Sequence, residues 1–297
     1  MQKRLAEIKD RVEEWPIALK NLVYWSYVQV AQPWLDANEG RRTCWKICMV
    51  NTAIWMAWQV PRLQPLMQRH FTHNPLSGLS YTILTSMFSH RSLLHLIANC
   101  MALSSFGSAA GIYLARQQHT KGCERESTIR YHLEAFILSA GLFSGLISHV
   151  ASSKILYPMM VRRLTSSTAA GNVANATRDT TEQVSRKNAI LPSLGISGAV
   201  YGAVTLTALA FPDTEISLMI PPTYPIPIQY GVGALVMLDI IGVLRGWRFL
   251  DHYAHLGGAA FGVLYYHYGP RTWNTLRCAA EDEGKAHKPW RVDPGRT

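Results

Sequence analysis

Residues 92–115, SLLHLIANCMALSSFGSAAGIYLA, contain no Lys, Arg, Asp or Glu. A helix needs about 20 residues to cross the hydrocarbon of a bilayer, so an uncharged run of this length indicates a membrane span. Residues 188–212 and 252–270 are also free of charged side chains. The sequence therefore predicts an all-α polytopic membrane protein.

The composition of the whole chain supports this class. Of its 297 residues, 48% are hydrophobic and 16% are charged, whereas a soluble domain has about 25% charged residues. A soluble enzyme, a disordered chain and a DNA-binding domain are therefore poor fits. The formal net charge of +10 is better explained by loops that face anionic lipid than by a nucleic-acid partner.

Charges and prolines divide the apolar sequence into six spans. These lie at about 43–60, 93–115, 133–153, 196–211, 228–244 and 253–268. Residues 15–35 are rich in Trp and Tyr but contain Lys20 and Gln29. We therefore expect them to form a helix in the headgroup zone rather than a seventh span.

The spans divide the chain into three parts. We expect a polar or interfacial segment at 1–42, a six-helix core at 43–270 and a polar tail at 271–297. Within the core, residues 154–192 are rich in Ser, Thr, Asn and Ala, and so predict a flexible exposed loop. Six spans put both termini on one side, where the loops carry more Lys and Arg, which favours the positive side of the membrane.

The N-terminus and the cysteines give weaker signals. Residues 1–14 mix both charge signs, and so match neither an acid-poor transit peptide nor a signal peptide. They are either a genuine polar N-terminus or the continuation of an upstream segment.

The cysteines are odd in number and form no CxxC pair, so we expect buried thiols rather than a disulfide framework. They are Cys44, Cys48, Cys100, Cys123 and Cys278.

The first candidate for chemistry is Gly195-Ile196-Ser197-Gly198, which opens the fourth span. A helix N-terminus offers unsatisfied backbone N–H groups and the positive end of the helix dipole. Such a position can stabilise the oxyanion that forms when a serine attacks a carbonyl. The alternative is a serine that only caps its helix within a glycine-rich packing motif.

The second candidate is His255, near the start of the sixth span. Imidazole is a suitable base for a serine nucleophile. Gly198 and Gly202 on the fourth span, and Gly258 and Gly262 on the sixth, are spaced as GxxxG. If these small residues let the two helices approach closely, Ser197 and His255 meet at one end of the bundle. The alternative is an interfacial histidine that hydrogen-bonds to the backbone.

The third candidate is a polar face at the start of the second span. His95 and Asn99 are four residues apart, so they share one helix face and can both donate hydrogen bonds. His90 precedes them, and Tyr201 shares a face with Ser197 and is placed to stack on His255. The alternative for each is an interhelical hydrogen bond or simple packing. No thiol or carboxylate cluster accompanies the histidines, so a metal site is not expected.

Together these motifs resemble the rhomboid family of intramembrane serine proteases. The family signatures are matched by His90 with the HxxxN pair His95 and Asn99, by GxSG at 195–198, and by AHxxG beginning at Ala254. The sequence WRFLDHYAHLGG at 247–258 resembles the mitochondrial, PARL-like branch in particular. That branch usually has a transit peptide and an extra helix before its six-span core, and neither is visible in this sequence.

The resemblance implies a six-transmembrane-helix rhomboid bundle with a Ser–His dyad and no cofactor. Ser197 would be the nucleophile and His255 the general base, with Tyr201 orienting His255. The backbone at Ser197 and Gly198, with His95 and Asn99, would hold the oxyanion. We expect no carboxylate beside the dyad, because an ionised Asp would need burial and pairing.

The resemblance also implies partners and a location. Substrates would be single-pass or presequence-bearing membrane proteins, or dynamin-related ones, in the mitochondrial inner membrane. One alternative is a catalytically inactive rhomboid-like scaffold or chaperone for membrane clients, although such relatives typically lose the serine or the histidine. A small transporter would show interrupted helices in repeated halves, and no such repeat is visible; Asp239 in the fifth span is the only feature that favours it.

Overall fold

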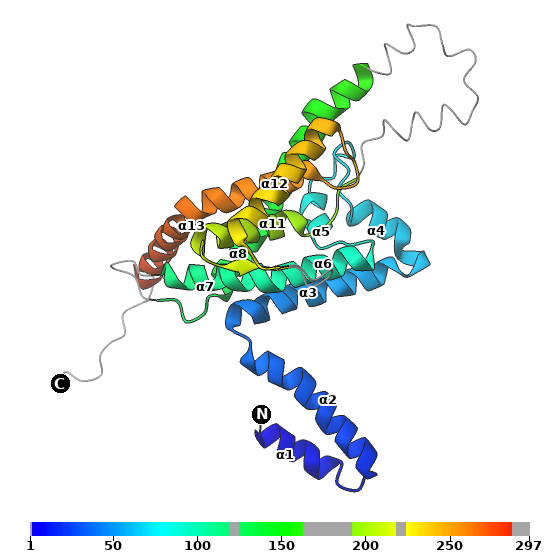
Figure 1. The fold of residues 1–297 in the computed structure, drawn as a ribbon, viewed down its shortest axis with the longest axis vertical. Coiled ribbons are helices and arrows are strands. Elements are labelled where there is room, and N and C mark those ends of the chain that lie inside the picture. The colour runs from blue at the N-terminus through cyan, green and yellow to red at the C-terminus, as the bar shows by residue number, and fades with distance from the viewer. Residues whose placement is uncertain (1, 119–124, 163–191, 218–223, 287–297) are drawn as a thin grey trace, which may run out of the picture.

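The computed structural model describes residues 2–118, 125–162, 192–217 and 224–286. The chain is mostly helical, and its N-terminal hairpin projects away from a helical bundle (Figure 1). The hairpin consists of α1 (Gln2–Arg11) and α2 (Ile17–Asp36), and no side chain of α2 is buried. Residues 15–35, expected in the headgroup zone, thus form a helix with exposed aromatic and aliphatic side chains such as Trp25 and Leu22.

The bundle contains the expected apolar runs as helices. Its long elements are α3 (Glu39–Trp58), α6 (Leu93–Ala102) with the π turn η2 (Leu103–Gly107) and α7 (Ser108–Arg116), α8 (Arg130–Ala151), α11 (Ser197–Ala210), α12 (Ile228–Arg245) and α13 (His252–Ala286). Shorter elements connect them: η1 (Pro61–Leu63), α4 (Gln64–His70), α5 (Thr82–Met87), the π turn η3 (Ser152–Leu156), and the antiparallel strands β1 (Glu215–Ile216) and β2 (Ile226–Pro227).

Helix α11 lies at the centre of the bundle. It packs against α13 and α8 and is buried along most of its length. A helix that is apolar on all sides, as α11 is, belongs in the interior. Its side chains join a core of fully buried residues from α8, among them Leu133, Phe136 and Ile137. The candidate serine therefore stands on the most enclosed helix of the bundle.

Glycines bring α11 and α13 into backbone contact. A Cβ atom added at Gly258 would lie 2.0 Å from the carbonyl oxygen of Gly198, and one at Gly262 would lie 2.6 Å from that of Gly202. Both distances are far below van der Waals contact, so no larger residue fits without separating the helices. The expected close approach of the two GxxxG faces is confirmed.

Within the part of the chain that the structure describes, three helices are long and apolar enough to cross a membrane by length and composition. They are Leu93–Arg116, Arg130–Arg162 and Ile228–Arg245, and Ser197–Ala210 is a shorter apolar helix. The expected count of six spans is thus not confirmed. Among the described helices, α3 and α13 match two of the other expected runs but carry charged residues, and α11 is shorter than the roughly 20 residues that a full crossing needs.

The loop expected at 154–192 begins later than predicted. The helix that starts at Arg130 continues to Arg162, because apolar residues such as Ile155 and Met159 follow Lys154 and extend the span. The remainder of that loop, 163–191, lies outside the described residues. The short β1–β2 pair lies between the fourth and fifth expected spans.

The polar tail expected at 271–297 is helical as far as Ala286, because α13 continues past Pro270. Tertiary contacts hold this extension: the Trp273 indole donates to Glu126 at 2.5 Å, the Arg277 guanidinium lies 3.4 Å from the same carboxylate, and His132 stacks on Trp273 with 4.6 Å between ring centroids. Residues 287–297 lie outside the described residues.

The cysteines differ from expectation at one position. Cys44, Cys48 and Cys100 are free thiols, as predicted. Cys278 on α13 is disulfide-bonded and so departs from the expectation of buried thiols. Cys123 lies outside the described residues.

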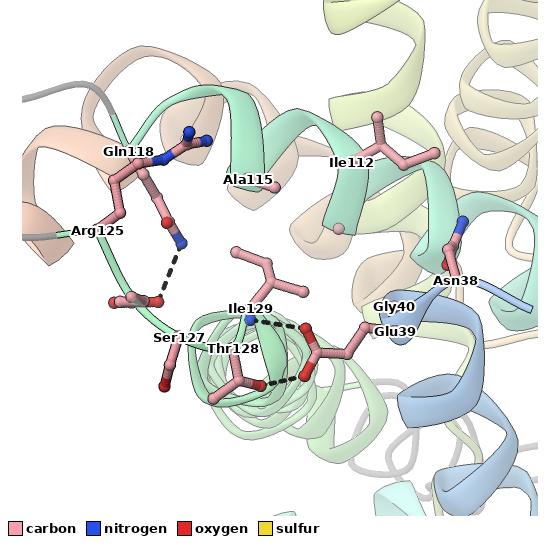
Figure 2. A pocket seen from close by; sticks show the side chains of 12 residues that line it. Asn38, Glu39, Gly40, Ile112, Ala115, Gln118, Arg125, Ser127, Thr128 and Ile129 are labelled. Carbon is pink, nitrogen blue, oxygen red and sulfur yellow. Dashed lines mark hydrogen bonds between the residues drawn. The ribbon is translucent and has the colours of Figure 1, made fainter.

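Polar capping closes one end of the bundle, where α3 and α8 begin. The Glu39 carboxylate accepts hydrogen bonds from the Thr128 hydroxyl and, at 3.1 Å, from the Ile129 N–H (Figure 2). The Gln118 amide donates to Glu126 at 3.1 Å across the same cavity of about 300 Å³. Glu39 thereby satisfies an N–H at the start of α8 and joins it to α3.

We predict that Gly258→Ala destabilises the bundle, because its methyl group would collide with the Gly198 carbonyl. Overpacking of this kind costs about 1–3 kcal/mol, measurable as a lower midpoint of thermal unfolding in detergent. Gly233→Ala on α12 is the matched control, since a Cβ there meets nothing within 4 Å. Equal midpoints for the two variants would contradict the backbone contact.

Candidate active site

Ser197 is the first residue of α11 and is half-buried. The preceding Gly195 has φ of +120°, a backbone conformation that favours glycine. Its N–H donates to the Ser86 carbonyl at 2.9 Å, which fixes the turn that leads into the helix. The serine hydroxyl thus stands at a helix N-terminus, beside N–H groups that lack intrahelical partners.

His255 lies in the first turn of α13 and contacts this serine. Its Nε2 is 3.0 Å from the Ser197 hydroxyl oxygen, across 58 positions in the chain. Tyr201, one turn further along α11, stacks on the imidazole with 4.3 Å between ring centroids and 11° between the planes. The expected meeting of Ser197 and His255 and the expected stacking of Tyr201 are both confirmed.

A carboxylate completes this cluster, which corrects the expectation that none would. Asp239 on α12 is fully buried, and its Oδ1 lies 3.1 Å from His255 Nδ1. The same oxygen lies 2.6 Å from Nδ1 of His252, which is also buried. Two imidazole rings therefore share one carboxylate oxygen, and these contacts offset part of the cost of burying the acid.

Of the residues expected around the oxyanion, His95 lies beside the turn before the serine, and Asn99 and His90 contact His95. A Cβ at Gly195 would lie 2.8 Å from the His95 ring, so the imidazole packs directly on the turn before Ser197. The Asn99 amide donates to the His95 carbonyl at 2.9 Å, and an amide nitrogen has a second hydrogen to offer. His90 is fully buried, with its ring edge-on to His95 at 5.0 Å.

Gly198 and Asp251 have structural roles beside the cluster. Gly198 packs under Ser144 of α8, where a Cβ would lie 1.9 Å from the Ser144 hydroxyl oxygen. Asp251 accepts from the Ala254 N–H at 3.0 Å and from the Ser148 hydroxyl at 2.6 Å. It therefore caps the start of α13 and joins it to α8, and it has no hydrogen bond to His255 other than through the backbone.

Sequence reasoning missed two members of the cluster, Asp239 and His252. The signal was present in the spacing, because His252 and His255 are three residues apart and share a face of α13. Asp239 is the only acid in its apolar span, and a buried acid there requires a partner. Gly242 of α12 leaves space for the imidazole of His252, since a Cβ at Gly242 would lie 2.4 Å from that ring.

The segment before Ser197 is anchored by His73, in the connection between α4 and α5. The backbone of His73 forms an isolated antiparallel bridge with Ser193 through hydrogen bonds of 2.9 and 3.0 Å. Its imidazole contacts the Thr82 hydroxyl at 2.8 Å and His149 of α8 at 3.0 Å. One buried histidine thus connects the segment before the serine to α5 and α8.

The arrangement supports nucleophilic catalysis. A hydroxyl, an imidazole and a carboxylate are in hydrogen-bonding sequence, and the hydroxyl stands at a helix N-terminus. This is the geometry in which a base activates a serine and a third group orients the base. Within the described residues, no group of three His, Cys, Asp or Glu side chains could hold a metal ion.

Comparisons with known proteins place these residues in one matched region. A family model described as the rhomboid domain matches residues 77–271. The chain is similar to presenilin-associated rhomboid-like protein A, mitochondrial, of Danio rerio, with 30% identity over 237 residues, which cover 80% of this chain and 50% of that protein. Presenilin-associated rhomboid-like protein, mitochondrial, of Homo sapiens shares 31% identity over the same coverage.

A more distant relative is rhomboid protein 1, mitochondrial, of Saccharomyces cerevisiae, with 26% identity over 219 residues, which cover 73% of this chain and 50% of that protein. The chain thus spans about half the length of these curated relatives. Every member of the serine cluster falls inside the region that the family model matches.

We predict an acid-sensitive stability that depends on His73. Burial, and then the electrostatic effect of the neighbouring His149, lower the pKa of His73 to about 4, against a weaker opposing effect of Asp251. The unfolded chain therefore binds a proton at His73 that the folded chain does not, between about pH 6.5 and pH 4, and stability falls as the pH falls through this window.

His73→Gln removes this titration and should flatten the pH dependence of the thermal midpoint relative to the unaltered protein. Burial and the charge of His95 lower the pKa of His90 to about 4 as well, so part of the dependence should persist in the variant. Identical midpoint curves for the two proteins between pH 4 and 7 would contradict the prediction.

Proposed function

The chain belongs to the rhomboid family, and from this premise we propose that it is a serine endopeptidase that cleaves peptide bonds in or beside the membrane-spanning segments of other proteins. The observation that carries the proposal is the 3.0 Å contact between Ser197 and His255 Nε2 at the N-terminus of α11. Relatives without activity typically lose one of these two residues, and this chain has both.

In this proposal His255 accepts the proton of the Ser197 hydroxyl as its oxygen attacks the carbonyl carbon of the scissile bond. The resulting oxyanion is stabilised by N–H groups of the first turn of α11 and by donors from His95 and Asn99. His255 then gives its proton to the leaving amine, and water hydrolyses the acyl-enzyme by the reverse assignment of roles.

Asp239 modifies the Ser–His dyad expected from the resemblance. Its carboxylate accepts from His255 Nδ1, which leaves Nε2 to act on the serine. The negative charge also stabilises the imidazolium that forms during attack. Tyr201 restrains the ring by stacking, so two contacts orient the base: the carboxylate sets the tautomer and the phenol ring sets the plane.

The proposed setting is a six-helix membrane core in the mitochondrial inner membrane. In this arrangement α3, α6–α7, α8, α11, α12 and α13 provide the six crossings, and α11 is short because the serine is recessed below the surface. The named relatives are mitochondrial proteins. Single-pass or presequence-bearing membrane proteins are the proposed substrates, and membrane lipid is the proposed surroundings.

We predict that Ser197→Ala and His255→Ala each abolish cleavage of a single-span test substrate in liposomes. The double variant should be no worse than either single variant, because residues that act as a unit lose activity together. Labelling by a serine-reactive fluorophosphonate should disappear in Ser197→Ala. If Ser197→Ala still cleaves, the protease assignment fails, and a scaffold for membrane clients becomes the better explanation.

We predict that Asp239→Asn lowers kcat by about tenfold or more with little change in KM, because the neutral amide stabilises neither the tautomer nor the imidazolium. Asp213→Asn, an exposed acid after α11, is the matched control and should keep full activity. A parallel rise in KM at unchanged kcat would assign Asp239 to substrate binding. If Asp239→Asn folds normally and its kinetics are unchanged, the mechanism uses only the dyad of Ser197 and His255.

A further inference from the structure

Two thiols from different helices meet on one side of the bundle. Cys48 lies on α3 and Cys100 on α6, and both are free. The Cys48 thiol donates to the Cys100 carbonyl oxygen at 3.7 Å. A cysteine side chain that touches the backbone of a second cysteine on a neighbouring helix places the two residues side by side, as a disulfide requires.

A cavity opens directly on this pair. Its volume is about 350 Å³, and both cysteines line it together with Trp45, Met101, Ser104 and Ser105. Met101 is 45% exposed, so the cavity reaches the outside of the bundle. The Trp45 indole donates to Ser104 at 2.9 Å, which holds α3 beside η2 at the edge of the cavity. The thiols are therefore half-buried but open to a small reagent.

The place of the cavity along the helices restricts which reagent reaches it. Cys48 is near the middle of the 20-residue helix α3, roughly 14 Å from its start at 1.5 Å per residue. Cys100 lies within the apolar span Leu93–Arg116. At this depth the surroundings are acyl chains rather than water, so a reagent carried by an acyl chain has direct access.

We propose that Cys48 and Cys100 are a dithiol modification site, which a lipid hydroperoxide oxidises to a disulfide that ties α3 to α6. One sulfur attacks the terminal peroxide oxygen, which gives a sulfenic acid and leaves the lipid as an alcohol. The second thiol attacks the sulfenic sulfur, and water leaves. Two thiols lose two protons and two electrons, and the hydroperoxide becomes one alcohol and one water.

The disulfide has a consequence for the serine cluster, which rests on the proposed function. Asn99 directly precedes Cys100, and His95 lies one turn before Asn99 on α6. Forming a bond of about 2.05 Å between the two sulfurs draws this part of α6 toward α3. A shift of about 1 Å in a positioned group can cost about 10²-fold in rate. The oxidised form is therefore the slower enzyme.

Cys44 provides an internal comparison. It is also a free thiol of α3, but it is fully buried, and its sulfur occupies the space where a Cβ at Gly107 would lie, 2.6 Å away. It does not line the cavity. Lipid-borne oxidant should therefore leave Cys44 unchanged.

The test uses the full chain in liposomes of phosphatidylcholine that carries linoleate hydroperoxide, with the matching lipid alcohol as control. After alkylation and proteolysis, mass spectrometry should find a peptide linking Cys48 to Cys100 and a loss of two alkylatable thiols per chain. Dithiothreitol should reverse both changes. Cys48→Ser and Cys100→Ser should each prevent the linked peptide, whereas Cys44→Ala should not.

Absence of the linked peptide in a folded protein would overturn the site, and linkage by copper phenanthroline without linkage by the hydroperoxide would overturn the oxidant. Where the reduced protein cleaves substrate, oxidation should lower kcat about tenfold or more at unchanged KM. A disulfide-linked protein with unchanged kcat would refute the proposed effect of the disulfide on the catalytic part of α6. A reduced protein that cleaves nothing would instead refute the proposed function, while the linked peptide would still establish the site.

Discussion

The close contact between α11 and α13 is the constraint on which the serine cluster depends. Ser197 and His255 are 58 positions apart, and only backbone contact between their helices brings the hydroxyl within 3.0 Å of the imidazole. Gly258 and Gly198 provide that contact, because any side chain at Gly258 would enter the Gly198 carbonyl. In a membrane, where apolar faces gain little by leaving lipid, such small-residue packing is the main source of helix affinity.

The buried carboxylate of Asp239 is the second constraint. An isolated charge in a low-dielectric interior is costly, so the carboxylate needs hydrogen-bond donors. His252 and His255 meet this need at 2.6 and 3.1 Å. The pairing also restricts His255, since a ring whose Nδ1 contacts the acid presents Nε2 to Ser197. The need to satisfy a buried acid and the need to orient a base are therefore met by the same contacts.

The sequence predicted more of the candidate site than of the boundaries around it. Ser197, His255 and Tyr201 could be placed because helix periodicity and GxxxG spacing are local patterns that determine which faces meet. Asp239 could not, because its partners lie on another helix and no local pattern states which way α12 faces. The extension of α13 past Pro270 depends on Glu126 and His132, which are contacts from distant parts of the chain and leave no signal in the tail itself.

Three helices begin at the same end of the bundle, and each has a polar side chain in or near its first turn: His95 on α6, Ser197 on α11 and His255 on α13. Their mutual contacts show that these N-termini converge. Each N-terminus has a partial positive charge, and N–H groups in its first turn lack intrahelical partners. The backbone alone therefore stabilises negative charge that develops between these N-termini, and side-chain donors add to this effect. The fold therefore favours an oxyanion at this point, and a nucleophile placed there gains more than the same residue would at any helix C-terminus.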